Sequence, residues 1–104
     1  MIRSFADRET EALFYTGKSR RYAAIVAVAK RKLQVLDNTS RLDDLREPAG
    51  NRLEALKGSR KGQYSIRIND QWRICFCWNA NDANDANDAN DANDAYEVAI
   101  VDYH

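Results

Sequence analysis

The residues best suited to acid–base chemistry stand at the carboxyl end of the sequence, which reads Val101-Asp102-Tyr103-His104. His104 is the only histidine, and imidazole is the side chain whose ordinary pKa lies nearest neutrality. A histidine in such a position is usually just exposed. With the carboxylate of Asp102 and the phenol of Tyr103 beside it, however, this string can supply the proton transfers of a general acid–base reaction.

A basic loop supplies charges that such a reaction on a phosphate needs. The string Lys57-Gly58-Ser59-Arg60-Lys61-Gly62 lacks the glycine-to-lysine spacing of a P-loop, so it does not predict nucleotide binding of that kind. A flexible loop of this kind can bind an RNA backbone, although solvated basic loops also occur in proteins that bind nothing. The candidate RNA-binding residues of the loop are Lys57, Arg60 and Lys61.

Together with Arg67 and Arg73, these groups suit metal-free cleavage of RNA. The 2′-hydroxyl of the substrate attacks the adjacent phosphate, a base takes its proton, an acid protonates the leaving 5′-oxygen, and cations stabilise the oxyanion. No metal or other cofactor is expected, because Cys75 and Cys77 with one distant histidine lack a second ligand pair at zinc-site spacing. The two thiols are expected to be reduced, since positions one residue apart on a strand do not fit disulfide geometry.

The net charge of zero hides an uneven distribution of charge along the chain. Residues 81–95 repeat Asn-Asp-Ala five times and hold five of the 16 acidic residues and no basic one. The other residues carry 16 basic side chains against 11 acidic ones, a balance that suits a polyanionic partner. The repeat, at about 79–95, is expected to form a flexible acidic loop because nothing in it offers apolar burial.

The elements that position these residues are expected to begin with two helices. Asp7 can cap a helix that runs to about Thr16, where Gly17 stands in the usual stop position. Ser19 can cap a second helix, along which apolar residues recur at intervals of three and four. The apolar positions are Tyr22, Ile25, Val26, Ala29, Leu33 and Leu36. A helical turn around residues 42–45 then precedes a Pro-Ala-Gly breaker.

After this break the periodicity changes to that of strands. Four short runs are predicted to be strands, the middle two with strict alternation of apolar and polar residues. They are residues 53–56, 64–68, 72–78 and 96–101. The expected fold class is α+β, with two N-terminal helices packed on an antiparallel or mixed sheet of four to five strands, in a single domain spanning residues 1–104.

The hairpin between the two central strands predicts a register. Directly opposed residues of an antiparallel pair point to the same face, so a two-residue turn at Asn69-Asp70 would set Arg67 opposite Trp72 and mix core with solvent faces. A three-residue loop sets Ile68 opposite Trp72 instead, and we prefer it. The same register opposes Ile66 with Ile74 and Tyr64 with Phe76. Arg67 then opposes Arg73, and two exposed like charges need either water or an anion such as a phosphate between them.

Neither a membrane span nor a leader is predicted. The longest apolar run, residues 22–29, is far short of the roughly 20 residues that a membrane helix needs. The start of the sequence, Met1-Ile2-Arg3-Ser4-Phe5, does not read as a signal peptide. We therefore expect a cytoplasmic protein with no membrane contact.

Several of these strings, in this order, resemble the HigB branch of the RelE/ParE toxin superfamily. The resemblance covers most of the chain and rests on the paired helices, the strand that enters Leu56-Lys57-Gly58, the strand at residues 64–68, Asn69-Asp70-Gln71-Trp72-Arg73-Ile74 and the terminal Asp102-Tyr103-His104. It implies a microbial RNase fold and a type II toxin that cleaves mRNA on the ribosome. The implied partners are a HigA-like helix-turn-helix antitoxin, the 70S ribosome with its mRNA, and operator DNA bound only through the antitoxin complex.

The resemblance also implies roles for individual residues. Carried over position by position, it assigns phosphate binding and transition-state stabilisation to Lys57, Arg67 and Arg73, and C-terminal function to Asp102, Tyr103 and His104. Glu54 departs from the pattern, because some relatives have a histidine implicated in cleavage two residues before the Leu-Lys-Gly string. A carboxylate at this position can act as a base or be an ordinary strand residue. Glu54 therefore joins the catalytic candidates, and the roles of base and acid stay open.

Two rival interpretations stay open as well. ParE-like members share the fold but inhibit DNA gyrase by binding it, without cutting RNA, and here the paired arginines and the C-terminal string favour the nuclease. The other rival is a retired toxin that keeps only its binding to the antitoxin. The departure at Glu54 and the expanded acidic repeat are the features that would fit such a protein.

Overall fold

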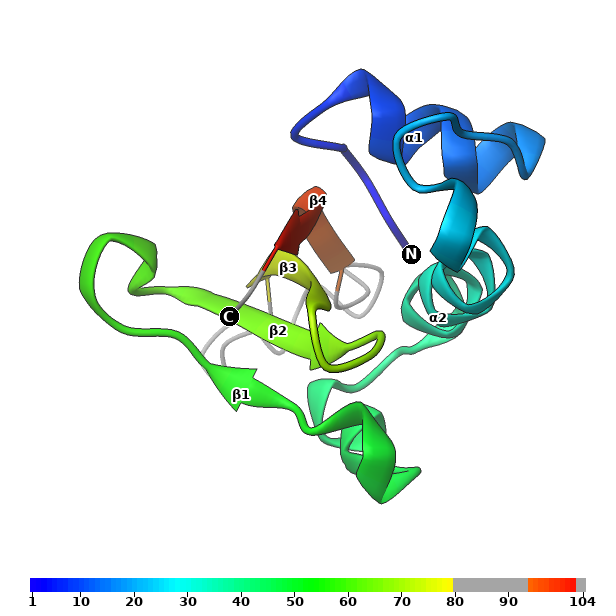
Figure 1. The fold of residues 1–104 in the computed structure, drawn as a ribbon. Coiled ribbons are helices and arrows are strands. Elements are labelled where there is room, and N and C mark those ends of the chain that lie inside the picture. Colours follow the sequence, from blue (N-terminus) through cyan, green and yellow to red (C-terminus); the bar gives the residue numbers. More distant parts are fainter. Residues whose placement is uncertain (80–93, 103–104) are drawn as a thin grey trace.

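The computed structural model describes residues 1–79 and 94–102, which form two layers, one of helices and one of strands. In chain order the elements are α1 (Arg8–Thr16), a 3₁₀ turn (Ala23–Ile25), α2 (Val26–Asn38), 3₁₀ turns at Leu42–Arg46 and Ala49–Asn51, β1 (Glu54–Ala55), a 3₁₀ turn at Gly58–Arg60, β2 (Gln63–Arg67), β3 (Trp72–Asn79) and β4 (Asp94–Asp102). The strands form one antiparallel sheet in the order β1-β2-β3-β4. Both α-helices lie on the same side of this sheet (Figure 1). The predicted α+β fold class is confirmed.

Helix α1 begins and ends where the sequence indicates. The Asp7 carboxylate accepts the amide N–H of Thr10 at 2.7 Å, which satisfies one of the donors that a helix start leaves unpaired. Gly17 ends the helix with a φ of 70°, a left-handed conformation that glycine adopts without steric cost. The hydroxyl of Ser19 accepts the amide N–H of Tyr22 at 3.1 Å, but this bond closes a turn that leads into the 3₁₀ turn Ala23–Ile25 and not into an α-helix. Helix α2 begins only after that turn, so its predicted start was wrong.

The hydrophobic core lies between the helices and the sheet face that they cover. The buried positions of α2 and of the turn before it are those of the predicted apolar stripe, namely Tyr22, Ile25, Ala29, Leu33 and Leu36. From the sheet, Ile66, Ile68, Ile74, Phe76, Val98 and Ile100 pack against them. Burial of each large apolar side chain contributes about 1.5–3 kcal/mol to folding, so this cluster holds the sheet against the helices.

The register between β2 and β3 is the predicted one. Arg67 pairs with Arg73, Ile66 with Ile74 and Tyr64 with Phe76. The amide of Ile68 donates to the carbonyl of Trp72 at 2.9 Å, which closes the hairpin with a three-residue loop. Strand β1 is shorter than predicted, with only two of the four expected residues. At the acidic repeat, β3 and β4 extend into the expected loop as far as Asn79 and Asp94, and residues 80–93 lie outside the described part of the chain.

The N-terminal segment runs beside β4 and secures it. Ile2 and Phe5 form parallel bridges to Ala95 and Val98, which make the edge of the sheet mixed. The buried carboxylate of Asp94 lies 2.8 Å from the guanidinium of Arg3 and 3.4 Å from the amine of Met1. These contacts anchor the first half of β4 to the N-terminal segment. No helix of the described residues is long and apolar enough to cross a membrane.

Candidate active site on the outer face of the sheet

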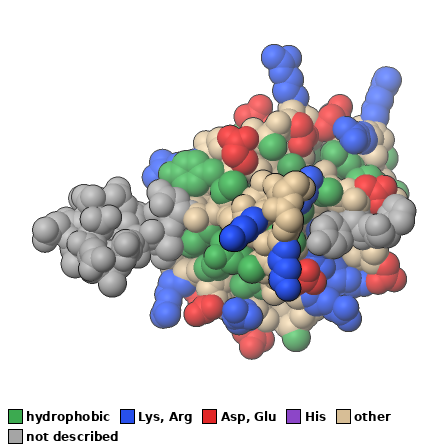
Figure 2. Space-filling model, turned by 90° about the vertical axis from the view of Figure 1, so that its left-hand side faces the viewer, with side chains coloured by type: hydrophobic (Ala, Val, Ile, Leu, Met, Phe, Trp, Pro, Cys, Tyr) green, Lys and Arg blue, Asp and Glu red, His purple; other side chains and the backbone are tan. Residues whose placement is uncertain are grey.

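We call the sheet face turned away from the helices the outer face. Side chains alternate between the two faces along each strand, and directly opposed residues share a face. Arg73 and its partner Arg67 therefore lie on the outer face, as do Ser65 and its partners Cys75 and Glu54. Figure 2 shows the side of the molecule that carries this face, where Lys and Arg side chains project among Asp and Glu. The strand pairing thus places three of the predicted site residues, Arg67, Arg73 and Glu54, on one face of the sheet.

Arg73 is not the exposed cation that the sequence suggested, since its side chain is 8% exposed. Its Nε donates to the Ser65 hydroxyl at 2.8 Å, and one terminal nitrogen donates to the carbonyls of Arg52 at 2.5 Å and Ser65 at 3.4 Å. The other terminal nitrogen lies 3.7 Å from a carboxylate oxygen of Glu54. A buried cation is tolerated only when it is paired and hydrogen-bonded, and these acceptors meet that requirement.

Arg67 has a different environment although it stands directly opposite. Its guanidinium donates to the carboxylate of Asp70 in the hairpin loop, and its side chain is 29% exposed. The expected need for an anion between Arg67 and Arg73 is therefore met within the protein, by a separate set of acceptors for each arginine. A phosphate is not required to hold the pair together, and Arg67 stays more accessible to solvent than Arg73.

Glu54 is the candidate carboxylate that the fold brings beside a candidate cation. It lies in β1 opposite Ser65, and its side chain is 50% exposed. The carboxylate is thus open to solvent on one side and faces the guanidinium of Arg73 on the other. This contact joins a group able to take a proton to a fixed positive charge.

The basic loop before β2 lies at the border of this face. Lys57 and Lys61 are exposed, whereas Arg60 is half-buried and donates to the side-chain oxygen of Gln63 at 3.2 Å. Burial raises the pKa of the Cys75 thiol, while the nearby charges of Arg60 and Arg73 oppose that rise. Cys75 and Cys77 are free thiols, and Cys75 is therefore a neutral, buried side chain near cations of both the loop and the sheet.

Of the three C-terminal candidates, the structure describes Asp102 alone. Asp102 pairs with Trp72, so it lies on the face that the helices cover and not on the face of Arg73. Its carboxylate accepts the side-chain amide of Gln71 at 3.3 Å. Asp102 is exposed, and its predicted catalytic role stays a prediction. Tyr103 and His104 lie outside the described residues.

Sequence reasoning missed three residues around Arg73. Ser65 is fully buried and accepts from Arg73, and its place two positions before Arg67 in an alternating strand already indicated the same face. Arg52 contributes a backbone carbonyl, for which the side-chain sequence carries no indication. Asn51, also fully buried, braces the turn that presents this carbonyl. The Pro-Ala-Gly breaker beside Asn51 predicted a turn. It did not predict which backbone groups the Asn51 side chain would bind.

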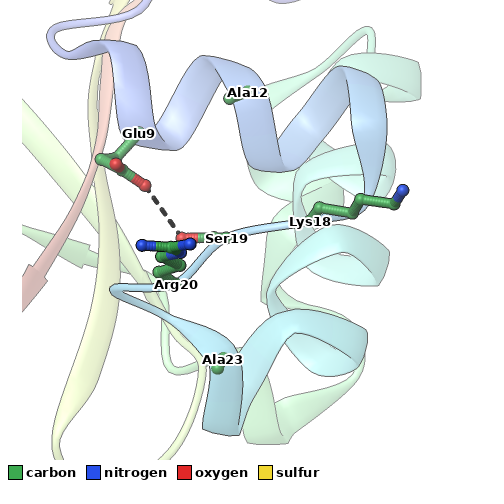
Figure 3. Close-up of a pocket in the computed structure, with 6 residues that line it drawn as sticks. All are labelled: Glu9, Ala12, Lys18, Ser19, Arg20 and Ala23. Atoms are coloured by element: carbon green, nitrogen blue, oxygen red, sulfur yellow. Dashed lines mark hydrogen bonds between the residues drawn. The ribbon is translucent and has the colours of Figure 1, made fainter.

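An open hollow of about 580 Å³ lies elsewhere, between α1 and the segment that follows it. Glu9 and Ala12 line it from the helix, and Lys18, Ser19, Arg20 and Ala23 line it from the chain beyond (Figure 3). The carboxylate of Glu9 accepts the Ser19 hydroxyl at 3.0 Å. Because the hollow lies on the helical side of the molecule, it is separate from the outer face and its candidate chemistry.

Comparison with known proteins gives the family of the chain. A family model described as "RelE-like toxin of type II toxin-antitoxin system HigB" matches residues 3–91. The chain belongs to the HigB-like toxins. Membership of a type II toxin–antitoxin family implies a partner antitoxin. The predicted resemblance to the HigB branch is therefore confirmed.

Individual relatives of this HigB-like toxin come from several bacteria. It is 40% identical to "Toxin HigB-1" of Vibrio cholerae over 80 residues, which cover 75% of this chain and 84% of that one. An "Uncharacterized protein" of Haemophilus influenzae is 36% identical over 55 residues, or 53% of this chain and 54% of its own. Among solved structures, the "YoeB/ParE toxin from Agrobacterium tumefaciens" aligns with a TM-score of 0.47 at 14% identity, over 82% of this chain and 81% of that one.

Proposed function

We propose that this HigB-like toxin is a ribosome-dependent endoribonuclease that cuts mRNA in the cytoplasm, and that a HigA-like helix-turn-helix antitoxin neutralises it. One observation carries the proposal: the half-exposed carboxylate of Glu54 lies 3.7 Å from the guanidinium of Arg73, on a sheet face bordered by a basic loop. A proton acceptor beside a fixed cation is what cleavage of a phosphodiester by its own 2′-hydroxyl requires.

In the proposed reaction, Glu54 takes the proton of the 2′-hydroxyl as that oxygen attacks the adjacent phosphorus. The new oxygen–phosphorus bond closes a cyclic phosphate, and the bond to the 5′-oxygen breaks. Arg73 stabilises the charge that develops on the non-bridging oxygens, because its guanidinium is held by protein acceptors before the substrate arrives. The reaction as written uses only protein groups and the hydroxyl of the substrate.

Protonation of the leaving 5′-oxygen is assigned to His104, with Tyr103 beside it, on residue type alone. Asp102 pairs with Trp72, so its exposed side chain leaves β4 on the face opposite to Arg73, and its predicted part in proton transfer stays a prediction. The flanking phosphates are contacts for exposed and partly exposed cations of the basic loop and β2, because phosphate contacts position an RNA without reading its sequence. These cations are Lys57, Arg60, Lys61 and Arg67.

In this proposal, the antitoxin complex also binds the operator, so the toxin reaches DNA only through its partner. The 70S ribosome is the platform that holds the mRNA in place. A small face with few groups for binding a single strand gains from such help, because positioning by a second surface supplies part of the entropy that cleavage costs.

Primer extension on a transcript induced together with the toxin tests the proposal. We expect new 5′ ends within translated codons for the wild-type chain, and none for Glu54→Gln. The matched control is Glu11→Gln, which neutralises an exposed carboxylate on α1 and should leave cleavage unchanged. Intact transcripts together with inhibited DNA supercoiling would contradict the nuclease proposal and indicate that the protein inhibits DNA gyrase. Intact transcripts with normal supercoiling, and retained antitoxin binding, would indicate a retired toxin.

A further inference from the structure

We infer that Ser65 and the backbone carbonyl of Arg52 form a receptor that positions the Arg73 guanidinium, and that Asn51 ties this receptor to α2. The inference extends the proposed function. Its statement about RNA cleavage rests on that proposal, whereas its statement about the orientation of Arg73 does not. It assigns positioning roles to residues that neither contact RNA in the proposal nor stand out in the sequence.

Ser65 holds one edge of the guanidinium. Its side chain is fully buried, its hydroxyl accepts from Nε of Arg73 at 2.8 Å, and its carbonyl lies 3.4 Å from a terminal nitrogen of the same group. A guanidinium is planar, with its donors in a fixed fork, so acceptors on two of its nitrogens determine the orientation of the whole plane. Ser65 therefore decides which way the opposite edge of the guanidinium, next to Glu54, faces.

Arg52 supplies the second point of attachment through its backbone. Its carbonyl oxygen lies 2.5 Å from the terminal nitrogen of Arg73. Arg52 has φ 46° and ψ 57°, a left-handed conformation that costs a residue with a side chain roughly 1–2 kcal/mol. This conformation reverses the chain immediately before β1 and turns the carbonyl toward β3. A strained residue that directs its carbonyl to a candidate catalytic group fits a positioning role.

Asn51 keeps that strained turn in place. Its side chain is fully buried, and its amide nitrogen donates to the carbonyls of Leu45 and Glu47, both at 3.2 Å. Its side-chain oxygen accepts from the ammonium of Lys32 on α2. Replacing this buried asparagine should lower stability, because its partners would lose hydrogen bonds that are buried or partly buried. The network therefore runs from α2 through Asn51 and the Arg52 carbonyl to Arg73.

This network has a catalytic consequence under the proposed function. Hydrogen-bond donors stabilise a transition state best when they are oriented in advance, and a displacement of about 1 Å can lower a rate by about 100-fold. Glu54 follows Arg52 by two residues and contacts Arg73 itself. The same receptor thus fixes both members of the candidate catalytic pair relative to each other.

The first test follows the side-chain Nε–H of Arg73 by ¹⁵N NMR, which needs no nuclease activity. We expect slow exchange of this proton with water in the wild-type chain and rapid exchange in Ser65→Ala. Ser65→Thr keeps the hydroxyl and should restore slow exchange. Cys75→Ala is the matched control, because Cys75 is the buried cross-strand neighbour of Ser65 on the same face. Equally fast exchange in wild type and Ser65→Ala would overturn the inference.

The second test measures single-turnover cleavage of mRNA on programmed ribosomes at increasing toxin concentration. For Ser65→Ala we expect the maximal rate to fall roughly 10-fold or more while the half-saturating concentration stays close to that of Cys75→Ala, at a temperature at which both variants are folded. Ser65→Thr should recover the rate. A Ser65→Ala variant that cleaves as fast as Cys75→Ala would overturn the inference, since the Ser65 hydroxyl would then have no role in positioning Arg73 for cleavage.

The tie to α2 is tested with Lys32→Met against Lys30→Met, because both remove one positive charge from the same helix. Lys32→Met should speed exchange of the Arg73 Nε–H, and Lys30→Met should not. Equal exchange rates of the Arg73 Nε–H in the two variants would show that Asn51 and α2 do not help to position Arg73. A wild-type chain that cleaves nothing would end the proposed function alone, and the exchange measurements would still decide whether the receptor holds Arg73.

Discussion

Arg67 and Arg73 stand directly opposite each other on β2 and β3, yet their guanidinium groups bind different acceptors. Like charges in such a pair repel, and the fold separates them by directing Arg67 toward Asp70 at the hairpin and Arg73 toward Ser65 and Arg52. One arginine is therefore partly exposed and the other is buried. The two should respond differently to substitution, although the sequence pattern treats them alike.

Stability is the first property in which the two arginines should differ. Arg73→Ala is expected to lower the free energy of unfolding by about 3 kcal/mol or more, because it strips buried acceptors of their partner. Arg67→Ala should lower it by at most about 1 kcal/mol, since the ion pair with Asp70 is exposed. Urea unfolding of both variants measures the difference. Equal losses would show that the burial of Arg73 contributes nothing to folding.

Asp70 competes with a phosphate for Arg67 in the proposed function. Asp70→Asn removes that negative charge from a fully solvated position, so binding of single-stranded RNA should tighten by roughly 2- to 5-fold at low salt, and less at high salt. The matched control is Asp43→Asn, because Asp43 forms the same kind of exposed i, i+3 pair with Arg46 outside the sheet. Fluorescence anisotropy measures both affinities. An equal gain for the two variants would attribute the effect to net charge alone.

Thr10 links α1 to β4 through one buried hydroxyl. The hydroxyl accepts the amide N–H of Ile100 at 3.1 Å and donates to the carboxylate of Asp7 at 3.0 Å. Thr10→Val keeps the shape but leaves a buried amide unpaired, so the free energy of unfolding should fall by about 1–3 kcal/mol. Thr16→Val, at an exposed threonine of the same helix, should change it by at most about 0.5 kcal/mol. Thermal unfolding distinguishes the two, and equal shifts would contradict the role of Thr10.

Asp94 should make the free energy of unfolding depend on pH in the acidic range. Burial would raise the pKa of its carboxyl group, but the hydrogen bonds and charges of Arg3 and the Met1 amine outweigh burial and hold the pKa below its ordinary value. A carboxyl group with a depressed pKa in the folded state stabilises fully above its unfolded pKa, about 3.9, and loses this contribution as the pH falls through the folded value.

The comparison of wild type with Asp94→Asn isolates this contribution. The wild-type chain should melt at a higher temperature than the variant at pH 6, and the difference should shrink below about pH 4. Asp44→Asn, at an exposed position, serves as the control and should show no such convergence. Parallel melting curves for wild type and Asp94→Asn down to pH 2 would contradict the prediction.

Much of the fold followed from local patterns. Asp7 and Gly17 bound α1 because capping and left-handed geometry are properties of single residues and their immediate neighbours. The opposition of Arg67 to Arg73 followed from alternation and loop length, which together leave one register that keeps the apolar face buried. The start of α2 was misjudged because a serine cap does not specify whether a 3₁₀ turn or an α-helix follows it.

The sequence by itself determined the family, the α+β architecture, the register of the central hairpin and the opposition of Arg67 and Arg73 on one face of the sheet. Only the tertiary structure decided that Arg73 is buried, that Asp102 lies on the opposite face, and that Ser65, Asn51 and the Arg52 carbonyl surround the candidate pair. The physical reason is that alternation and capping depend on neighbours in the chain. Burial and backbone hydrogen bonds depend on segments that meet only after folding, such as the turn before β1 and the middle of β3.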